Sequence, residues 1–274
     1  VVYLTPVTFG GYSSNLKRMV DHQIQNVSPS FTTIEGEIHH KARYASNPDL
    51  LAVGWMDGPD ERAAAVFGHL VRRNALNLHA RASVAAVVTA DLTDGALQAA
   101  AQGWLGDIED GRTASPARLP ESHTDVGEAS EVRRALLLVG SPRTRKSTSH
   151  ALGSYLYQQL QARSIQTKTI YPHTVLRSTA KTQELLELVE EADLVTLAFP
   201  LYVDSLPAPV IDILERIAVH RQGRHGRPQL FTAIVNCGFP EVVHNATALA
   251  ICETFAQQVG FEWAGSLALG GGGA

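Results

Sequence analysis

The sequence predicts an α/β fold with a doubly wound parallel sheet, present as a tandem repeat whose first copy is N-terminally incomplete. Short apolar segments of strand length alternate with longer segments of helical period, which indicates strands joined by crossover helices. Several of the short segments are apolar throughout, as is typical of parallel strands buried on both faces. A chain of 274 residues has room for two such units.

The second half of the chain shows this alternation most clearly. The expected strands are 135–139, 166–171, 194–199, 229–236 and 263–269. Helical spacing of apolar residues predicts helices around 152–160 and 185–192, and at 207–219 and 242–259. We therefore expect a complete five-stranded unit at 135–274 that lacks only its last helix.

The first half repeats part of the same pattern. Its expected strands are 1–6, 51–55 and 83–89, and its expected helices lie around 67–78 and 90–108. The strand VVYLTP resembles VTLAFP at 195–200, and GPDE at 58–61 resembles GFPE at 238–241. We therefore predict a partial first domain at 1–110 with an insertion at about 28–47. The polar, Pro- and Gly-containing segment 111–134 is the expected linker.

Composition limits the possible partners and the compartment. A formal net charge of −4 indicates no basic face, so nucleic acid is not an expected partner. No apolar run approaches the roughly 20 residues that a membrane span needs. Two cysteines in so long a chain, Cys237 and Cys252, favour a reducing compartment, and we expect a cytoplasmic protein. The chain begins without Met and ends in a glycine run, so we expect both ends to be cut from a longer protein.

A polar loop, GSPRTRKSTS at 140–149, lies between a predicted buried strand and a predicted helix. Backbone N–H groups and the helix dipole favour an anion at such a helix start. Hydroxyl groups and the Arg143 guanidinium add donors for phosphate oxygens. A hydroxyl-capped helix start with exposed basic residues remains the alternative. A Walker-type loop is disfavoured because Arg145 stands where that motif needs its second glycine.

Three loops together resemble those of flavodoxin-like NAD(P)H-dependent FMN reductases: GSPRTRKSTS, then FPLYVDSLP at 199–207, then NCGFPE at 236–241. The resemblance implies a flavodoxin-like fold, an FMN cofactor and NADPH or NADH as electron donor. It implies that the first loop holds the flavin phosphate and that the other two lie against the ring. Lys146-Ser147-Thr148 departs mildly from the family's Gly-Asn-Thr. The cofactor-binding residues so implied are Ser141, Arg143, Ser147, Thr148, Ser149, Pro200, Leu201, Tyr202, Val203, Asp204, Asn236, Cys237, Gly238 and Glu241.

Some of these residues have plainer explanations. Tyr202 is expected to contact the flavin ring, against the alternative of a partly buried loop aromatic. Glu241 is as readily explained as an acid at a helix start. Cys237 is better explained as a small loop residue than as a redox thiol, which would need a lowered pKa. In the insertion, His39 and His40 cannot both face one way on a strand, and no metal site is expected there. A substrate-access or domain-contact role and a merely solvated loop both remain open for this segment.

The leading function hypothesis is an FMN-dependent NAD(P)H oxidoreductase that passes electrons to a small-molecule acceptor. The flavin would perform the chemistry, and we name no catalytic side chain. One alternative is a flavin-binding electron carrier without nicotinamide activity, and another is a non-catalytic interaction module. A homodimer, or a pseudo-dimer formed by the two repeats within one chain, is expected from the resemblance.

Overall fold

The computed structural model describes residues 1–113, 118–124, 131–223 and 227–272. The chain divides into two compact units. The first unit comprises Val1–Pro120 together with Val203–Ser205, and the second comprises Glu121–Tyr202 and Leu206–Ala274. The division after residue 120 falls inside the segment 111–134 that the sequence marks as a linker, and the domain boundaries of the sequence analysis stay predictions.

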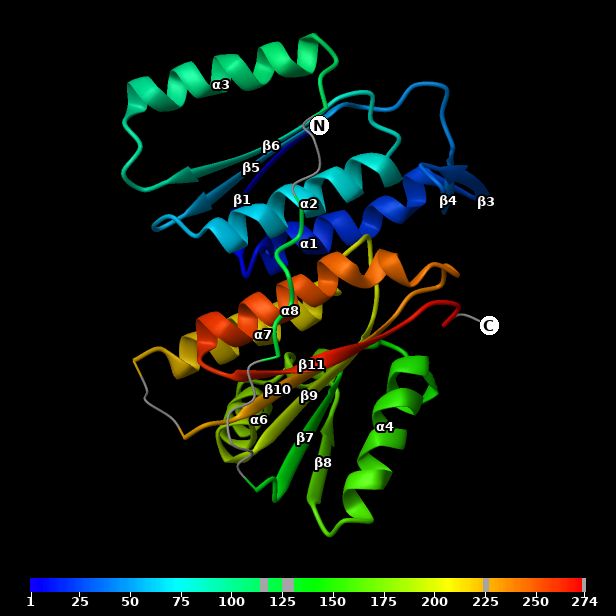
Figure 1. The fold of residues 1–274 in the computed structure, drawn as a ribbon, viewed down its shortest axis with the longest axis vertical. Helices are drawn as coiled ribbons and strands as arrows, with labels where there is room; N and C mark the ends of the chain where they lie inside the picture. The colour runs from blue at the N-terminus through cyan, green and yellow to red at the C-terminus, as the bar shows by residue number, and fades with distance from the viewer. Residues whose placement is uncertain (114–117, 125–130, 224–226, 273–274) are drawn as a thin grey trace. The chain divides into compact units, whose positions relative to one another are not determined.

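A five-stranded parallel sheet forms the centre of the second unit (Figure 1). Its order is β11-β10-β9-β7-β8, which is the doubly wound order 5-4-3-1-2 within the unit. Each strand begins and ends within one residue of its predicted range. The strands are β7 (Arg134–Val139), β8 (Gln166–Ile170), β9 (Leu194–Pro200), β10 (Leu230–Asn236) and β11 (Glu262–Leu269).

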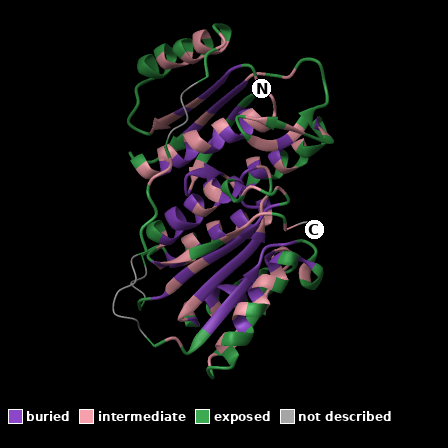
Figure 2. Cartoon of the chain, turned by 45° about the vertical axis from the view of Figure 1, so that its right-hand side comes forward, coloured by how far each residue is buried: buried purple, intermediate pink, exposed green. Residues whose placement is uncertain are grey.

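Helices cover both faces of this sheet, so its central strands are buried, as the purple colour in Figure 2 shows. Helix α4 lies on one face, and α6, α7 and α8 lie on the other (Figure 1). An ideal Cβ at Gly153 would lie 2.8 Å from Leu137 of β7, so this glycine lets α4 approach the sheet closely. The helices are α4 (Thr148–Gln161), α5 (Pro172–Val175), α6 (Thr179–Glu191), α7 (Ala208–Arg221) and α8 (Ala246–Val259), and the 3₁₀ turns are η2 (Thr144–Lys146) and η3 (Val242–Asn245).

The first unit contains a smaller sheet of order β2-β1-β5-β6, in which β1, β5 and β6 are parallel. Helix α3 lies on one face of this sheet, and α2 lies on the other (Figure 1). Phe67 and Leu70 of α2 are fully buried, as the helical spacing predicts. The elements are β1 (Val2–Thr8), β2 (Gly11–Tyr12), α1 (Ser14–Asp21), η1 (His22–Asn26), β5 (Leu50–Met56), α2 (Glu61–Asn77), β6 (Ser83–Thr89) and α3 (Asp94–Glu109).

The inserted segment of the first unit forms a β-hairpin of β3 (Val27–Ile34) and β4 (Glu37–Ala42). The sequence pattern indicated a loop here. Glu35 and Gly36 connect the strands with φ angles of 52° and 86°, the left-handed pair that two-residue hairpins favour. On β4, His39 is fully buried and His40 is half-buried, as the alternation of side chains along a strand requires.

Candidate functional site

The loops that follow β7, β9 and β10 lie at the carboxyl-terminal edge of the second unit's sheet. From β7 the chain passes to β8 on one side, whereas β9 lies on the other side of β7. The strand order therefore reverses between β7 and β9. Loops that leave a parallel sheet at such a point diverge, and open α/β sheets bind their ligands in the crevice that results.

The loop between β7 and α4 is closely fixed by its neighbours. An ideal Cβ at Gly140 would lie 2.4 Å from Val210 of α7, so only glycine fits at the end of the strand. Thr144 has a φ of 49°, a left-handed conformation that is uncommon for a β-branched residue. Such strain persists only where the surroundings enforce it, and it is frequent at ligand sites.

Ser147 caps helix α4. Its Oγ accepts a hydrogen bond from the His150 N–H at 3.1 Å and donates one to the Thr144 carbonyl oxygen at 2.7 Å. Thr148 and Ser149 are the first two residues of the helix. Their backbone N–H groups have no acceptor within the helix and point out of its start. These two donors therefore meet at the positive end of the helix dipole.

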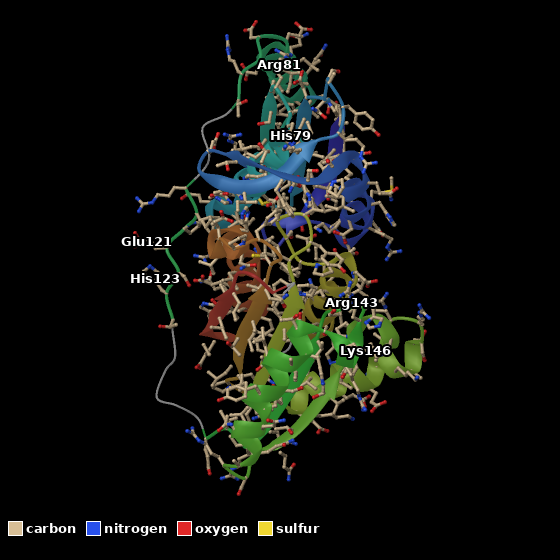
Figure 3. All side chains as sticks on the ribbon, turned by 90° about the vertical axis from the view of Figure 1, so that its right-hand side faces the viewer. His79, Arg81, Glu121, His123, Arg143 and Lys146 are labelled. Carbon is tan, nitrogen blue, oxygen red and sulfur yellow. The ribbon has the colours of Figure 1, made fainter. Side chains whose placement is uncertain are left out.

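Exposed cations lie on the loop that leads into this helix. Arg143 and Lys146, both labelled in Figure 3, lie on the same loop, and both side chains are exposed. Backbone donors, a helix dipole and exposed basic side chains together favour a dianion such as a phosphate monoester. The arrangement fits a phosphate group through its backbone and Arg143.

The hydroxyl groups of the loop have a different role in the structure. Ser141 is buried, and its Oγ accepts the Arg143 N–H at 3.4 Å. Ser149 is buried and donates from Oγ to Asn236 Oδ1 at 2.8 Å, which joins two predicted site residues from different loops. Thr148 donates from Oγ1 to the Gly272 carbonyl oxygen at 2.8 Å. These hydroxyls fix the loop, and their role as phosphate ligands stays a prediction.

The loop after β9 lies next to the loop after β10. The Leu201 N–H donates to the Asn236 carbonyl oxygen at 2.8 Å, while Pro200 is half-buried. Tyr202 follows with 37% of its surface exposed. Val203 and Asp204 then have φ angles of 44° and 58°. Tyr202 is thus placed at an accessible position just before a left-handed turn.

Asp204 differs from the other predicted cofactor residues. It is only 3% exposed. Its Oδ2 accepts hydrogen bonds from Asn74 Nδ2 at 3.0 Å and from Asn77 Nδ2 at 2.6 Å. These three residues belong to the first unit. No sequence pattern indicates the two asparagines, because they stand on α2, more than 120 residues before Asp204.

Cys237 is held as a buried thiol in the loop after β10. It is 2% exposed, and its Sγ lies 3.4 Å from the Phe239 carbonyl oxygen and 3.6 Å from Asn245 Nδ2. Burial raises the pKa of the Cys237 thiol. A raised pKa keeps the sulfur protonated at neutral pH, which is unlike a redox-active thiol. The interpretation as a small loop residue therefore agrees with its surroundings.

The rest of this loop is more open. Gly238 is exposed, and an ideal Cβ there would meet no atom within 4 Å. Glu241 is half-buried, with Oε2 at 3.6 Å from Nε2 of the buried His244. Glu241 stands directly before η3, so it occupies the position of an acid at a helix start.

The glycine run after β11 also joins this edge and was not among the predicted site residues. The Gly271 N–H donates to the Phe239 carbonyl oxygen at 2.7 Å, and the Gly272 N–H donates to that of Cys237 at 2.8 Å. An ideal Cβ at Gly270 would lie 2.1 Å from the Pro240 carbonyl oxygen. The run itself was the available signal, since glycines mark close approaches of backbone to backbone.

No group of three or more His, Cys, Asp or Glu side chains in the described part of the chain is arranged to hold a metal ion. Within the same residues, no helix combines the length and the apolar character needed to cross a membrane.

Several solved structures are similar to about half of this chain. No curated protein matches the chain. A putative quinone reductase from Klebsiella pneumoniae is 17% identical, over 51% of this chain and 76% of that one, with a TM-score of 0.39. An FMN-dependent NADH-azoreductase from Bacillus anthracis str. Ames Ancestor, in complex with FMN, is 12% identical. The similarity covers 50% of this chain and 85% of that one, with a TM-score of 0.40. An NAD(P)H:quinone oxidoreductase from Methanothermobacter marburgensis is 16% identical, over 52% of this chain and 85% of that one, with a TM-score of 0.41.

A protein-family model gives the more direct assignment. Residues 133–231 match the model described as a flavodoxin-like fold. The match begins one residue before β7 and ends within β10, so it includes the first two of the three loops described above. The strand order of the sheet is that of the same fold. The second unit of the chain therefore has a flavodoxin-like fold.

Proposed function

We propose that this chain is an FMN-dependent oxidoreductase that takes electrons from NADPH or NADH and passes them to a small-molecule acceptor. The observation that supports the proposal is the start of α4, where two N–H groups without an acceptor in the helix and Arg143 lie beside the reversal of strand order. The resemblance of the three loops to those of FMN reductases supports the choice of a flavin phosphate as the anion.

In this proposal the protein binds and shields the cofactor. The N–H groups of Thr148 and Ser149 and the Arg143 guanidinium hold the phosphate. Tyr202 lies along the flavin ring, and the loop at 236–238 excludes water from its other side. When bound, FMN supplies the hydride chemistry, so the proposal needs no protein nucleophile.

The phosphate site is tested by comparing two flavins in the full chain. Arg143→Ala should weaken FMN binding by about tenfold or more, since a charge-assisted hydrogen bond contributes roughly 1.5–3 kcal/mol. The same variant should bind riboflavin, which lacks the phosphate, as the wild-type chain does. Arg163→Ala is the matched control, because Arg163 is also exposed but follows the opposite end of α4. Equal FMN affinity in the Arg143 variant and the control would remove this site.

Electron transfer is tested separately with the FMN-loaded chain under anaerobic conditions. Rapid bleaching of the flavin absorbance on addition of NADPH or NADH is the expected result. A chain that binds FMN but is bleached only by a chemical reductant is an electron carrier without nicotinamide activity. A chain that binds no flavin at saturating FMN, and so stays colourless, is neither an oxidoreductase nor an electron carrier of this kind. This result would favour a non-catalytic interaction module.

A further inference from the structure

Positive charge is concentrated in one stretch of the second unit. The chain as a whole has 27 acidic and 23 basic residues, and its net charge of −4 predicted no basic face. Residues 132–183 nevertheless contain no Asp or Glu. The basic residues of this stretch are Arg133, Arg134, Arg143, Arg145, Lys146, Arg163, Lys168, Arg177 and Lys181. Any carboxylate that pairs with these cations must therefore come from another part of the fold.

Only three of these cations have such a partner. Lys168 Nζ lies 3.0 Å from Glu184 Oε1, and the arginines at 133 and 134 pair with Glu131 and Glu191. The other six side chains are exposed, and none of them forms an ion pair with a carboxylate of the described residues. Their charges are therefore open to solvent and to an anionic ligand.

Five of these six cations lie at the carboxyl-terminal edge of the sheet. Arg143, Arg145 and Lys146 stand on the loop after β7. Arg177 stands between α5 and α6, and Lys181 is in the first turn of α6. Since α5 and α6 follow β8, these two residues lie at the same edge as the loop after β7.

The two groups of cations follow neighbouring strands of the second unit. β7 and β8 are parallel and pair up to Leu138 and Ile170, so the segments that follow them begin about 5 Å apart. His150 in the first turn of α4 also meets the chain after β8, with Nδ1 at 3.2 Å from the Tyr171 hydroxyl oxygen. The four cations other than Arg143 are called the basic rim, which consists of Arg145, Lys146, Arg177 and Lys181.

The basic rim exceeds what a flavin phosphate requires. In the proposed function, backbone N–H groups and Arg143 hold that phosphate, which carries about two negative charges. The rim adds its charges at the same edge, and the next acid along the chain, Glu184, is already paired with Lys168. A second anionic group near this edge would therefore meet a positive potential that FMN alone does not neutralise.

We infer that the basic rim selects NADPH over NADH as the electron donor by attracting the 2′-phosphate of NADPH. The inference rests on the proposed function. The two donors differ only in this group, a phosphate monoester with about two negative charges at neutral pH. Exposed charges attract an anion over the Debye length, so the rim favours the encounter with the more negative donor. It takes no part in hydride transfer, and its residues determine specificity.

The test compares bleaching of the FMN-loaded full chain by NADPH and by NADH without oxygen. In wild type at low salt, the second-order rate constant should be about tenfold higher for NADPH, since each exposed charge contributes roughly twofold. The ratio should fall to about one in the quadruple variant Arg145→Gln, Lys146→Gln, Arg177→Gln and Lys181→Gln. The limiting rate at saturating donor should not change. Because both donors act on the same preparation, differences in FMN content cancel in the ratio.

A matched variant and salt serve as controls. Arg163→Gln should keep the wild-type ratio, because Arg163 is an exposed cation of the same stretch but follows the opposite end of α4. Raising NaCl from about 0.01 M to about 1 M shortens the Debye length from about 30 Å to about 3 Å, and should bring the wild-type ratio close to one. A wild-type ratio near one at low salt, or a ratio that the four substitutions leave unchanged, would overturn the inference.

Nucleotide binding distinguishes failure of this inference from failure of the proposed function. Adenosine 2′,5′-bisphosphate carries the 2′-phosphate of NADPH, and 5′-AMP lacks it. In calorimetric titrations at saturating FMN, wild type should bind the bisphosphate about tenfold more tightly than AMP, and the quadruple variant should bind both alike. If neither donor bleaches the chain, the proposed function fails and the donor preference fails with it, while the titration still decides whether the rim binds the 2′-phosphate. Equal wild-type affinities for the two nucleotides show that it does not, whatever the bleaching result.

Discussion

At the scale of single residues, the loop at 140–149 contains a side chain that serves folding and, near it, one that is proposed to serve binding. Ser147 is 8% exposed, and its hydroxyl is occupied by the His150 N–H and the Thr144 carbonyl oxygen. Arg143 lies exposed on the same loop. Substitution of Ser147 therefore affects stability first, whereas substitution of Arg143 affects only what binds there.

A pair of variants at Ser147 separates its two roles. Ser147→Ala removes the helix cap and should lower the stability of the second unit by about 1 kcal/mol. Ser147→Asp keeps a capping carboxylate and favours the helix dipole, so it should keep the unfolding midpoint near that of wild type. Its negative charge should nevertheless weaken FMN binding strongly by repelling the phosphate.

Thermal unfolding followed by circular dichroism measures the first effect, and FMN titration measures the second. If Ser147→Asp bound FMN as tightly as wild type, the phosphate would not lie at the start of α4.

At the scale of elements, the hairpin β3–β4 depends on its two-residue turn. Gly36 has a φ of 86°, and an ideal Cβ there would meet no atom within 4 Å. Any cost of a side chain at this position therefore comes from the backbone conformation alone. Glu35, at 52°, is the less common choice for such a turn, which prefers Asn-Gly or Asp-Gly.

Replacement of glycine by alanine should have opposite effects on the stability of the first unit at two positions. Gly36→Ala should destabilise the unit by about 1–2 kcal/mol, the cost of a left-handed L-residue. Gly103→Ala, in the exposed part of α3 and also free of neighbours within 4 Å, should stabilise it by about 1 kcal/mol. Urea unfolding of both variants is the measurement. A Gly36→Ala chain as stable as wild type would show that the hairpin turn is not left-handed in solution.

At the scale of the whole molecule, the two units offer unequal surroundings for a flavin. In the second unit, β9 pairs with β7, which leads through the polar loop into α4. In the first unit, β1 pairs along its length with β5, and its other edge pairs only at Val7 and Thr8, with β2. The described part of the first unit contains no strand, polar loop and helix beside β1 like the ones that lead into α4 and are proposed to hold the phosphate.

We therefore expect one FMN per chain at saturation. The stoichiometry can be measured from flavin and protein absorbance after gel filtration of the FMN-loaded chain. Arg143→Ala should reduce the retained flavin at a fixed FMN concentration, since it affects the single site. Two flavins per wild-type chain would place a site in the first unit. So would an Arg143→Ala chain that retains as much flavin as wild type.

The sequence by itself determined the regular structure of the second unit and its flavodoxin-like fold. Apolar periodicity is a local property, so it located all five strands to within one residue, from Arg134–Val139 to Glu262–Leu269. It also placed the polar loop between a buried strand and a helix start. The hairpin was missed because Glu-Gly is a weak turn signal and only the backbone shows its two left-handed residues.

Only the tertiary structure decided what the polar side chains do. Ser149 and Asn236 meet although 87 residues separate them, and Asn77 and Asp204 meet across 127. A hydroxyl or carboxylate has the same sequence signature whether it faces a ligand or a buried amide. The partner of such a group is set by which chain segments the packing of apolar faces brings together, because each buried polar atom must then be satisfied where it lies.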